Sequence, residues 1–117
     1  MDVAAEPVVL IAREGALLSV VCARLAMAGE TPITAVDCAD PRLDDGLRKR
    51  AMLVVEASRL SVDPEEAVVA LRAQGWSGKL AVLVNGVPDG SPPSRVAWVD
   101  SRGGTAAIMT AIATLRA

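Results

Sequence analysis

Residues 51–60 read AMLVVEASRL, and the apolar run at the start of this stretch ends at Glu56. A continuous run rich in Val and Leu, without polar alternation, is typical of a strand that is buried on both faces of a parallel sheet. Runs of the same kind recur along the chain and are separated by segments with helical spacing. The candidate strands cover residues 8–12, 32–36, 51–55, 80–84 and 96–99.

The segments between these strands carry helix signals. Gly29 follows an apolar pattern of helical spacing and is typical of a helix C-terminus. Asp63 and Pro64 combine an N-cap residue with proline at the first helical position. Asp40 and Pro41 repeat that combination. The predicted helices cover residues 15–28, 40–50, 63–75 and 105–116.

Strands that alternate with helices at this spacing predict an α/β fold with right-handed crossovers. We expect a doubly wound, five-stranded parallel sheet of order 2-1-3-4-5, which is the flavodoxin-like arrangement. Residues 85–95 depart from the alternation, because they are fewer than the dozen or so of an ordinary parallel crossover. Pro88, Pro92 and Pro93 also oppose a helix there. The helix between the fourth and fifth strands is therefore predicted to be lost or reduced to one turn.

Composition narrows the function classes. We expect the 117 residues to form one domain, residues 1–117, that buries a core without disulfides or metals. A net charge of −2 and the lack of Phe and Tyr give no basis for nucleic-acid binding. No apolar run approaches the roughly 20 residues of a membrane span, and the acidic N-terminus is unlike a signal peptide. We therefore expect a cytoplasmic protein that binds neither nucleic acid nor membrane.

The chain also lacks the usual catalytic groups. It has no His, and Cys22 and Cys38 do not have the CxxC spacing of a zinc or redox site. Ser-His and Cys-His catalysis are removed, as is the commonest metal ligand. We expect no enzyme activity, no metal and no cofactor, and we interpret both cysteines as buried thiols.

Four stretches resemble successive parts of a response-regulator receiver domain, and together they span most of the chain. Residues 8–18, VVLIAREGALL, match its first strand and helix, and AMLVVEASRL matches its phosphoacceptor strand. Residues 70–86, ALRAQGWSGKLAVLVNG, and residues 95–117, RVAWVDSRGGTAAIMTAIATLRA, match its later strands and helices. The resemblance implies a place in two-component signal transduction.

The resemblance also assigns the family's functional positions, and most of them hold different residues here. The acid pair after the first strand corresponds to Ala12 and Arg13, with Glu14 next, and the phosphoacceptor Asp corresponds to Glu56. The hydroxyl after the fourth strand corresponds to Asn85, or to Gly86 in a shifted register. The Lys after the fifth strand corresponds to Ser101, and the aromatic switch residue corresponds to Trp98.

Phosphoryl transfer needs a cation held by several carboxylates. Because the acid pair, the acceptor, the hydroxyl and the Lys are all replaced, the resemblance implies an atypical pseudo-receiver that is not phosphorylated. We expect a protein-protein interaction or dimerisation module of bacterial signalling or localisation, with a protein partner or a second copy bound. A further hypothesis is that an Arg13–Glu56 ion pair fills the vestigial site; alternatively, both side chains reach solvent.

The last predicted helix is the candidate contact surface. Ile108, Ile112 and Leu115 form a stripe that should face the sheet, while a second face carries Met109, Ala113 and Ala106. A dimer or partner interface through Met109, Ala113 and Trp98 follows from this pattern. The alternative is an Ala-rich helix that the Pro/Gly loop covers.

Two other functions stay open. A flavodoxin-like ligand-binding protein or enzyme would use the carboxyl ends of the strands, or backbone N–H groups at Gly103-Gly104-Thr105. A receiver phosphorylated at an unorthodox acid would use Asp37, Glu14 or Asp100. The residues that the carboxyl ends of the strands should bring together are Arg13, Glu14, Glu56, Ser58 and Asn85.

Overall fold

The computed structural model describes residues 7–11, 16–35, 40–56 and 63–116. In chain order its elements are β1 (Val8–Ile11), α1 (Ala16–Met27), β2 (Ile33–Ala35), α2 (Asp45–Arg50), β3 (Met52–Glu56), α3 (Pro64–Ala73), β4 (Leu80–Val84), β5 (Val96–Asp100), the 3-10 helix η2 (Ser101–Gly103) and α4 (Gly104–Arg116). None of the helices in the described ranges is long and apolar enough to cross a membrane.

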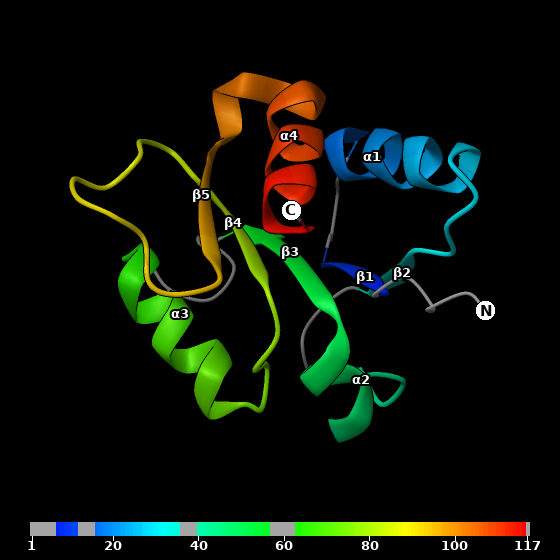
Figure 1. Cartoon of the computed structure of the whole chain (residues 1–117), viewed down its shortest axis with the longest axis horizontal. Helices are drawn as coiled ribbons and strands as arrows, with labels where there is room; N and C mark the ends of the chain where they lie inside the picture. Colours follow the sequence, from blue (N-terminus) through cyan, green and yellow to red (C-terminus); the bar gives the residue numbers. More distant parts are fainter. Residues whose placement is uncertain (1–6, 12–15, 36–39, 57–62, 117) are drawn as a thin grey trace.

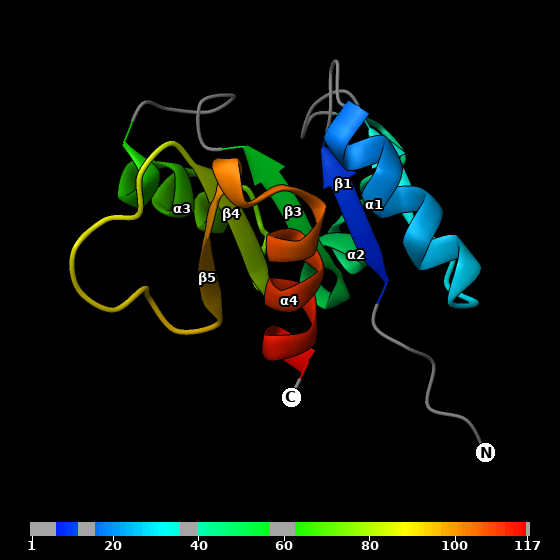
Figure 2. The same cartoon turned by 90° about the horizontal axis from the view of Figure 1, so that it is seen from above.

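All five strands run parallel in one sheet of order β2-β1-β3-β4-β5. The central strand β3 pairs on both sides, so that Val54 stands between Leu10 of β1 and Ala81 of β4. Figure 1 shows α1 and α4 on one face of the sheet and α2 and α3 on the other, and Figure 2 shows the same layers from above. The predicted flavodoxin-like α/β fold and its strand order are confirmed.

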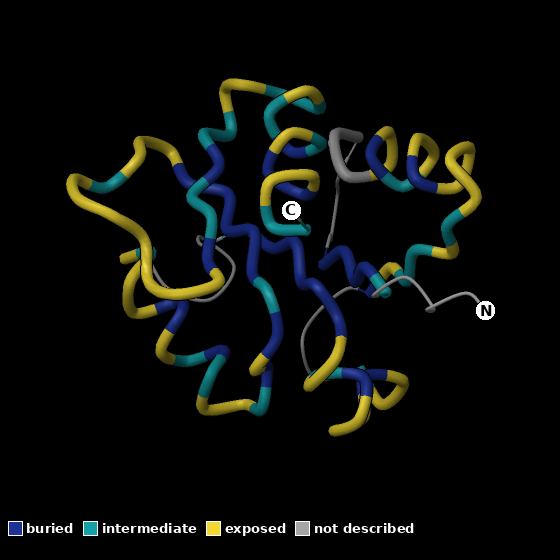
Figure 3. The backbone as a smooth tube through the Cα atoms, in the orientation of Figure 1, coloured by how far each residue is buried: buried dark blue, intermediate teal, exposed yellow. Residues whose placement is uncertain are grey.

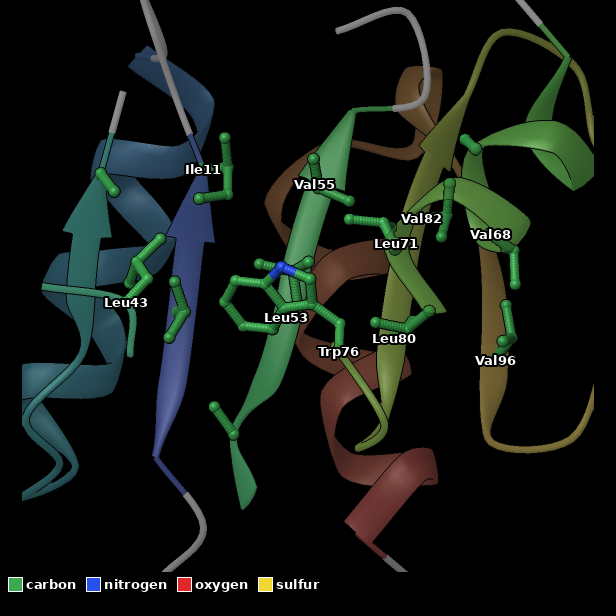
Figure 4. Packing of buried hydrophobic residues seen from close by; sticks show 14 of the residues in the cluster. Ile11, Leu43, Leu53, Val55, Val68, Leu71, Trp76, Leu80, Val82 and Val96 are labelled. Atoms are coloured by element: carbon green, nitrogen blue, oxygen red, sulfur yellow. The ribbon is translucent and has the colours of Figure 1, made fainter. Parts of the chain in front are cut away.

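The α3-side core fills the space between the sheet and the α2–α3 layer (Figure 4). It forms because alternate side chains of each strand point to this face. Trp98 and Ile33 are partly buried against it. Its buried members are Val9, Ile11, Ala35, Leu43, Leu47, Ala51, Leu53, Val55, Ala67, Val68, Leu71, Trp76, Leu80, Val82, Val84 and Val96.

The α4-side core lies on the opposite face, between the sheet and the α1–α4 layer. The predicted stripe of the last helix is confirmed, since Ile108 and Ile112 are buried here and Leu115 packs at the margin. Figure 3 shows the result: the central strands are buried along most of their length, and most of the exposed residues lie on helix exteriors and in loops. The buried members are Val8, Leu10, Val21, Leu25, Met52, Val54, Ala81, Leu83, Val99, Ile108, Ala111 and Ile112.

Two predicted helix ends are confirmed in detail. Asp63 caps α3, because its carboxylate accepts a hydrogen bond from the backbone N–H of Glu65 at 3.0 Å. Pro64 is the first helical residue, where it loses no backbone hydrogen bond. Gly29 follows α1 with a φ of 89°, a conformation that favours glycine at a helix end.

The predicted start of the second helix is wrong. The cap of α2 is Asp44, whose carboxylate accepts a backbone N–H of the first turn at 2.8 Å. Asp40 instead accepts hydrogen bonds from the backbone and side chain of Arg42, and its carbonyl accepts the N–H of Leu43 at 2.9 Å. Leu43 is buried in the α3-side core, so the chain makes a turn that inserts this side chain before the helix begins.

The loss of the helix between β4 and β5 is confirmed. Residues 85–95 are all described and contain no helix. In Figure 1 this segment is the long yellow loop beside α3. A right-handed crossover from β4 to β5 would have placed a helix on the same face as α3, so the face that loses a helix is the α3 side.

Trp76 is the largest side chain that is fully buried. Figure 4 shows its ring lying against β3 beside Leu53. The guanidinium of Arg48 lies 5.9 Å from the ring centroid, within range of a cation–π interaction. Among the described residues the indole N–H has no hydrogen-bond partner, which costs about 1–3 kcal/mol for a buried donor.

Two replacements of Trp76 separate the stabilisation that comes from packing of its ring from the cost of its unpartnered N–H. Trp76→Ala should lower the free energy of unfolding by about 3–5 kcal/mol because it leaves a large cavity. Trp76→Phe should cost less than half as much, since it retains most of the ring and removes the unpartnered N–H. Urea unfolding followed by far-UV circular dichroism measures both, and equal losses would contradict this account.

Gly78 lies where the chain enters β4, packed against the backbone that enters β3. A Cβ at this position would overlap the carbonyl oxygen of Ala51, which belongs to rigid backbone and cannot move aside cheaply. By contrast, a Cβ at Gly46 in α2 would meet only the carboxylate of Asp44 at an ordinary 3.6 Å. Alanine at these two positions is therefore expected to change the free energy of unfolding in opposite directions.

We expect Gly78→Ala to lower the free energy of unfolding by about 2 kcal/mol or more, because it overpacks two strand entries. Gly46→Ala should raise it by about 0.5–1 kcal/mol, since alanine restricts the unfolded chain and favours a helix. Thermal unfolding of both variants measures the difference. A harmless alanine at position 78 would show that the two strand entries are not in close contact.

An ion pair joins the end of α4 to the turn after α1. The guanidinium of Arg116 donates to both carboxylate oxygens of Glu30, at 2.6 and 2.9 Å. Both side chains are only partly exposed, at 28% and 21%. The hydrogen bonds from Arg116 lower the pKa of Glu30 from its usual 4.5, and burial opposes this shift.

A carboxylate with a lowered pKa stabilises the fold above pH 4.5, and this contribution is lost as the pH falls through the lowered pKa. Glu30→Gln should therefore lower the free energy of unfolding at pH 7 by about 1 kcal/mol, because solvent still screens the pair. Below pH 4.5 the difference from the parent protein should shrink. Urea midpoints across this pH range measure it, and Asp89→Asn, which removes the same charge from an exposed loop, is the control.

Candidate functional site

The carboxyl ends of β3, β4 and β5 lie at one edge of the sheet, because the strands are parallel. Glu56 is the last residue of β3, is half-buried, and pairs in register with Leu83. Asn85 follows β4, and Ser101 follows β5. The sheet thus brings three of the predicted site residues, Glu56, Asn85 and Ser101, to the same edge.

Asn85 and Ser101 bind each other. The hydroxyl of Ser101 donates a hydrogen bond of 2.7 Å to the side-chain oxygen of Asn85. This bond links the ends of two adjacent strands through neutral groups. The bond uses the hydroxyl proton of Ser101 and one lone pair of the Asn85 oxygen. A ligand at this point would have to compete for both.

Asp100 is engaged in local structure. Its carboxylate caps η2 by accepting the backbone N–H of Arg102 at 2.9 Å, and it pairs with the guanidinium of Arg102 at 3.0 Å. The hydrogen bonds from Arg102 hold the pKa of Asp100 below its usual value. Asp100 is thus a capping carboxylate.

Several predicted site residues lie outside the described ranges. In the part of the chain that the structure describes, no group of three or more His, Cys, Asp or Glu side chains is placed to hold a metal ion. The Arg13–Glu56 ion pair remains a hypothesis, because Arg13 is among the residues not described. The residues concerned are Ala12, Arg13, Glu14, Asp37, Cys38 and Ser58.

The glycines before α4 have a packing role. A Cβ at Gly103 would lie 2.6 Å from the Cβ of Ala107, so only glycine allows the turn to pack on the first turn of α4. Gly104 has a φ of 69°, which L-residues with side chains rarely adopt. Close packing at Gly103 and the positive φ of Gly104 account for this Gly-Gly pair without an anion site, which was the alternative considered for it.

The predicted interface residues do not share one face of the sheet. Trp98 is half-buried against the α3-side core, whereas Met109 is half-buried against the α4-side core. Ala113 is exposed on α4. A partner that covers Ala113 therefore lies on the other side of the sheet from Trp98.

A cleft that the sequence analysis did not identify lies between α3 and the end of the β4–β5 loop. It has a volume of about 600 Å³, is mostly apolar and is open to solvent. The three prolines of residues 85–95 were the available signal, but the sequence pattern placed the candidate contact surface on the last helix and not beside α3. The lining residues are Glu65, Val68, Val69, Arg72, Ser77, Pro93, Ser94 and Arg95.

Comparison of the chain with protein-family models, with curated proteins and with solved structures finds no match. What is shown is therefore the architecture, a five-stranded parallel sheet of flavodoxin-like order with helices on both faces. Function has to be argued from the residues at the sheet edge and along α3.

Proposed function

We propose that this chain is a receiver-like module that binds other proteins and does not carry out phosphotransfer. One observation carries the proposal: the hydrogen bond of 2.7 Å between Ser101 and Asn85. The resemblance to receivers puts a phosphoryl-binding hydroxyl at Asn85 and a Lys at Ser101. Here the two side chains are neutral and bound to each other, and because both are neutral, neither supplies a cation for a phosphoryl group.

The third position of this edge supports the same reading. Glu56 ends β3 where the resemblance requires the acceptor Asp, and its side chain is longer by one methylene. A flavodoxin-like scaffold that retains its sheet and both cores without the charged groups of phosphotransfer is suited to presenting a surface. The net charge of −2 makes nucleic acid a poor partner for that surface, which favours a protein.

An amide NMR titration with Mg²⁺ and then beryllofluoride, a phosphoryl mimic, tests the absence of phosphotransfer. We expect no saturable shifts at Glu56, Asn85 or Ser101, because no cluster of carboxylates in the described ranges is placed to hold the cation. A phosphorylatable receiver under the same conditions is the positive control. Saturable shifts that spread to Trp98, and that Glu56→Gln removes, would show that the acceptor and its switch survive.

A further inference from the structure

The cleft beside α3 has apolar walls and a basic end. Val68 and Val69 line it from α3, and Pro93 lines it from the loop before β5. Val69 is 69% exposed, which is high for a valine on a helix that packs against a sheet. Arg72 and Arg95 stand at the same cleft. Glu65 is its acidic residue and lies seven positions before Arg72 on α3, or about 10 Å along the helix axis.

The two arginines bring positive charge together, and no ion pair within the described ranges neutralises either of them. Within the described part of the chain, Arg72 donates to neutral carbonyls, those of Trp76 at 2.7 Å, Gly78 at 2.6 Å and Ser94 at 3.3 Å. The ion pairs formed within the described ranges include neither Arg72 nor Arg95. Burial, and next the positive charge of Arg95, lower the pKa of Arg72. An anion bound here would favour the charged form of Arg72 and offset its repulsion by Arg95.

Arg95 also stands in a backbone conformation that suits glycine. Its φ is 61°, at the third position of a turn closed by a hydrogen bond of 3.1 Å from the N–H of Val96 to the carbonyl of Pro93. Turns with positive φ at this position ordinarily use Gly or Asn. The carbonyl of Arg95 is fixed by the N–H of Leu80 at 2.9 Å, so the strain is held in place by the sheet. A side chain kept at a strained position points to a role other than stability.

We propose that this cleft docks a peptide segment of a partner protein in which a carboxylate side chain stands next to apolar side chains. The proposal rests on the proposed function as a protein-binding module and names the surface and the chemistry of the partner. The carboxylate pairs with Arg72 and Arg95, and the apolar side chains cover Val69 and Pro93. Figure 1 shows the two walls, α3 and the yellow loop, side by side.

The same features disfavour other occupants. A symmetric dimer centred on the two arginines would bring four guanidinium groups together, because an isologous interface places each patch against itself. A small carboxylate ligand would ordinarily be enclosed over most of its surface, whereas this cleft is open to solvent. Val69, Pro93, Ser94 and Arg95 of its lining are exposed, as an open peptide groove requires.

The test is to select peptides from a phage-displayed library of random short sequences against the immobilised full chain. We expect the enriched peptides to carry Asp or Glu beside apolar residues. Amide NMR shifts caused by a synthetic copy of an enriched peptide should map to α3 and to residues 93–95. Sedimentation of the chain alone should show no self-association through this surface.

Variants separate binding from folding. Arg95→Gly should weaken the peptide's Kd about tenfold, the value of one charged hydrogen bond, while leaving the urea midpoint unchanged or higher. Val69→Glu should also weaken binding, because it adds a negative charge to the wall. Arg24→Ala is the matched control: it removes one positive charge from the exposed side of α1, across the sheet, and should change the Kd by less than about twofold.

Four results would overturn the proposal: no peptide is enriched, the enriched peptides are basic or uncharged, their shifts map away from α3, or Arg95→Gly binds as well as the parent chain. A self-association that Arg95→Gly abolishes would assign the cleft to a second copy and would also overturn it. Peptides that bind only at α1 or α4 would refute the cleft and leave the protein-binding function standing. Saturable beryllofluoride shifts at Glu56 would refute that function and leave the cleft to be judged by the peptides alone.

Discussion

Burial of the central strands on both faces is the constraint on which the rest of the structure depends. The buried strands β1, β3 and β4 carry apolar side chains alternately into the α3-side core and the α4-side core. A strand of this composition cannot leave either face in water, since each apolar residue contributes about 1.5–3 kcal/mol on burial. Two helical layers are therefore required, and the chain supplies them with α1 and α4 on one face and α2 and α3 on the other (Figure 1).

The layer on the α3 side covers its face of the sheet without a helix between β4 and β5. Residues 85–95 cross from β4 to β5 as a loop, and Val82, Val84 and Val96 are nevertheless buried. Arg72 contributes by bridging the end of α3, the entry to β4 and the loop through three carbonyls. The cleft between α3 and the loop lies on the face of the sheet where this loop replaces a helix.

Sequence patterns predicted the parts of the fold that local chemistry decides. The apolar runs predicted the strands, the flavodoxin-like arrangement of alternating strands and helices predicted their order, and Asp63 with Pro64 predicted the start of α3. Asp40 failed as a cap because Arg42 and the burial of Leu43 compete for the same turn, a tertiary effect that no local pattern contains. At the site, the replacement of residues could be read from the chain, but the contact of Asn85 with Ser101 and that of Arg72 with the loop depend on how distant segments meet.

The placement of the two tryptophans has a consequence for spectroscopy. Trp76 lies in the α3-side core and Trp98 is half-buried against it, and the chain has no Phe or Tyr. All intrinsic fluorescence and near-ultraviolet absorption by aromatic side chains therefore arise on one side of the sheet. Tryptophan fluorescence from this protein therefore reports on the layer that contains the cleft. The α1–α4 layer contributes no fluorescent side chain within the described residues.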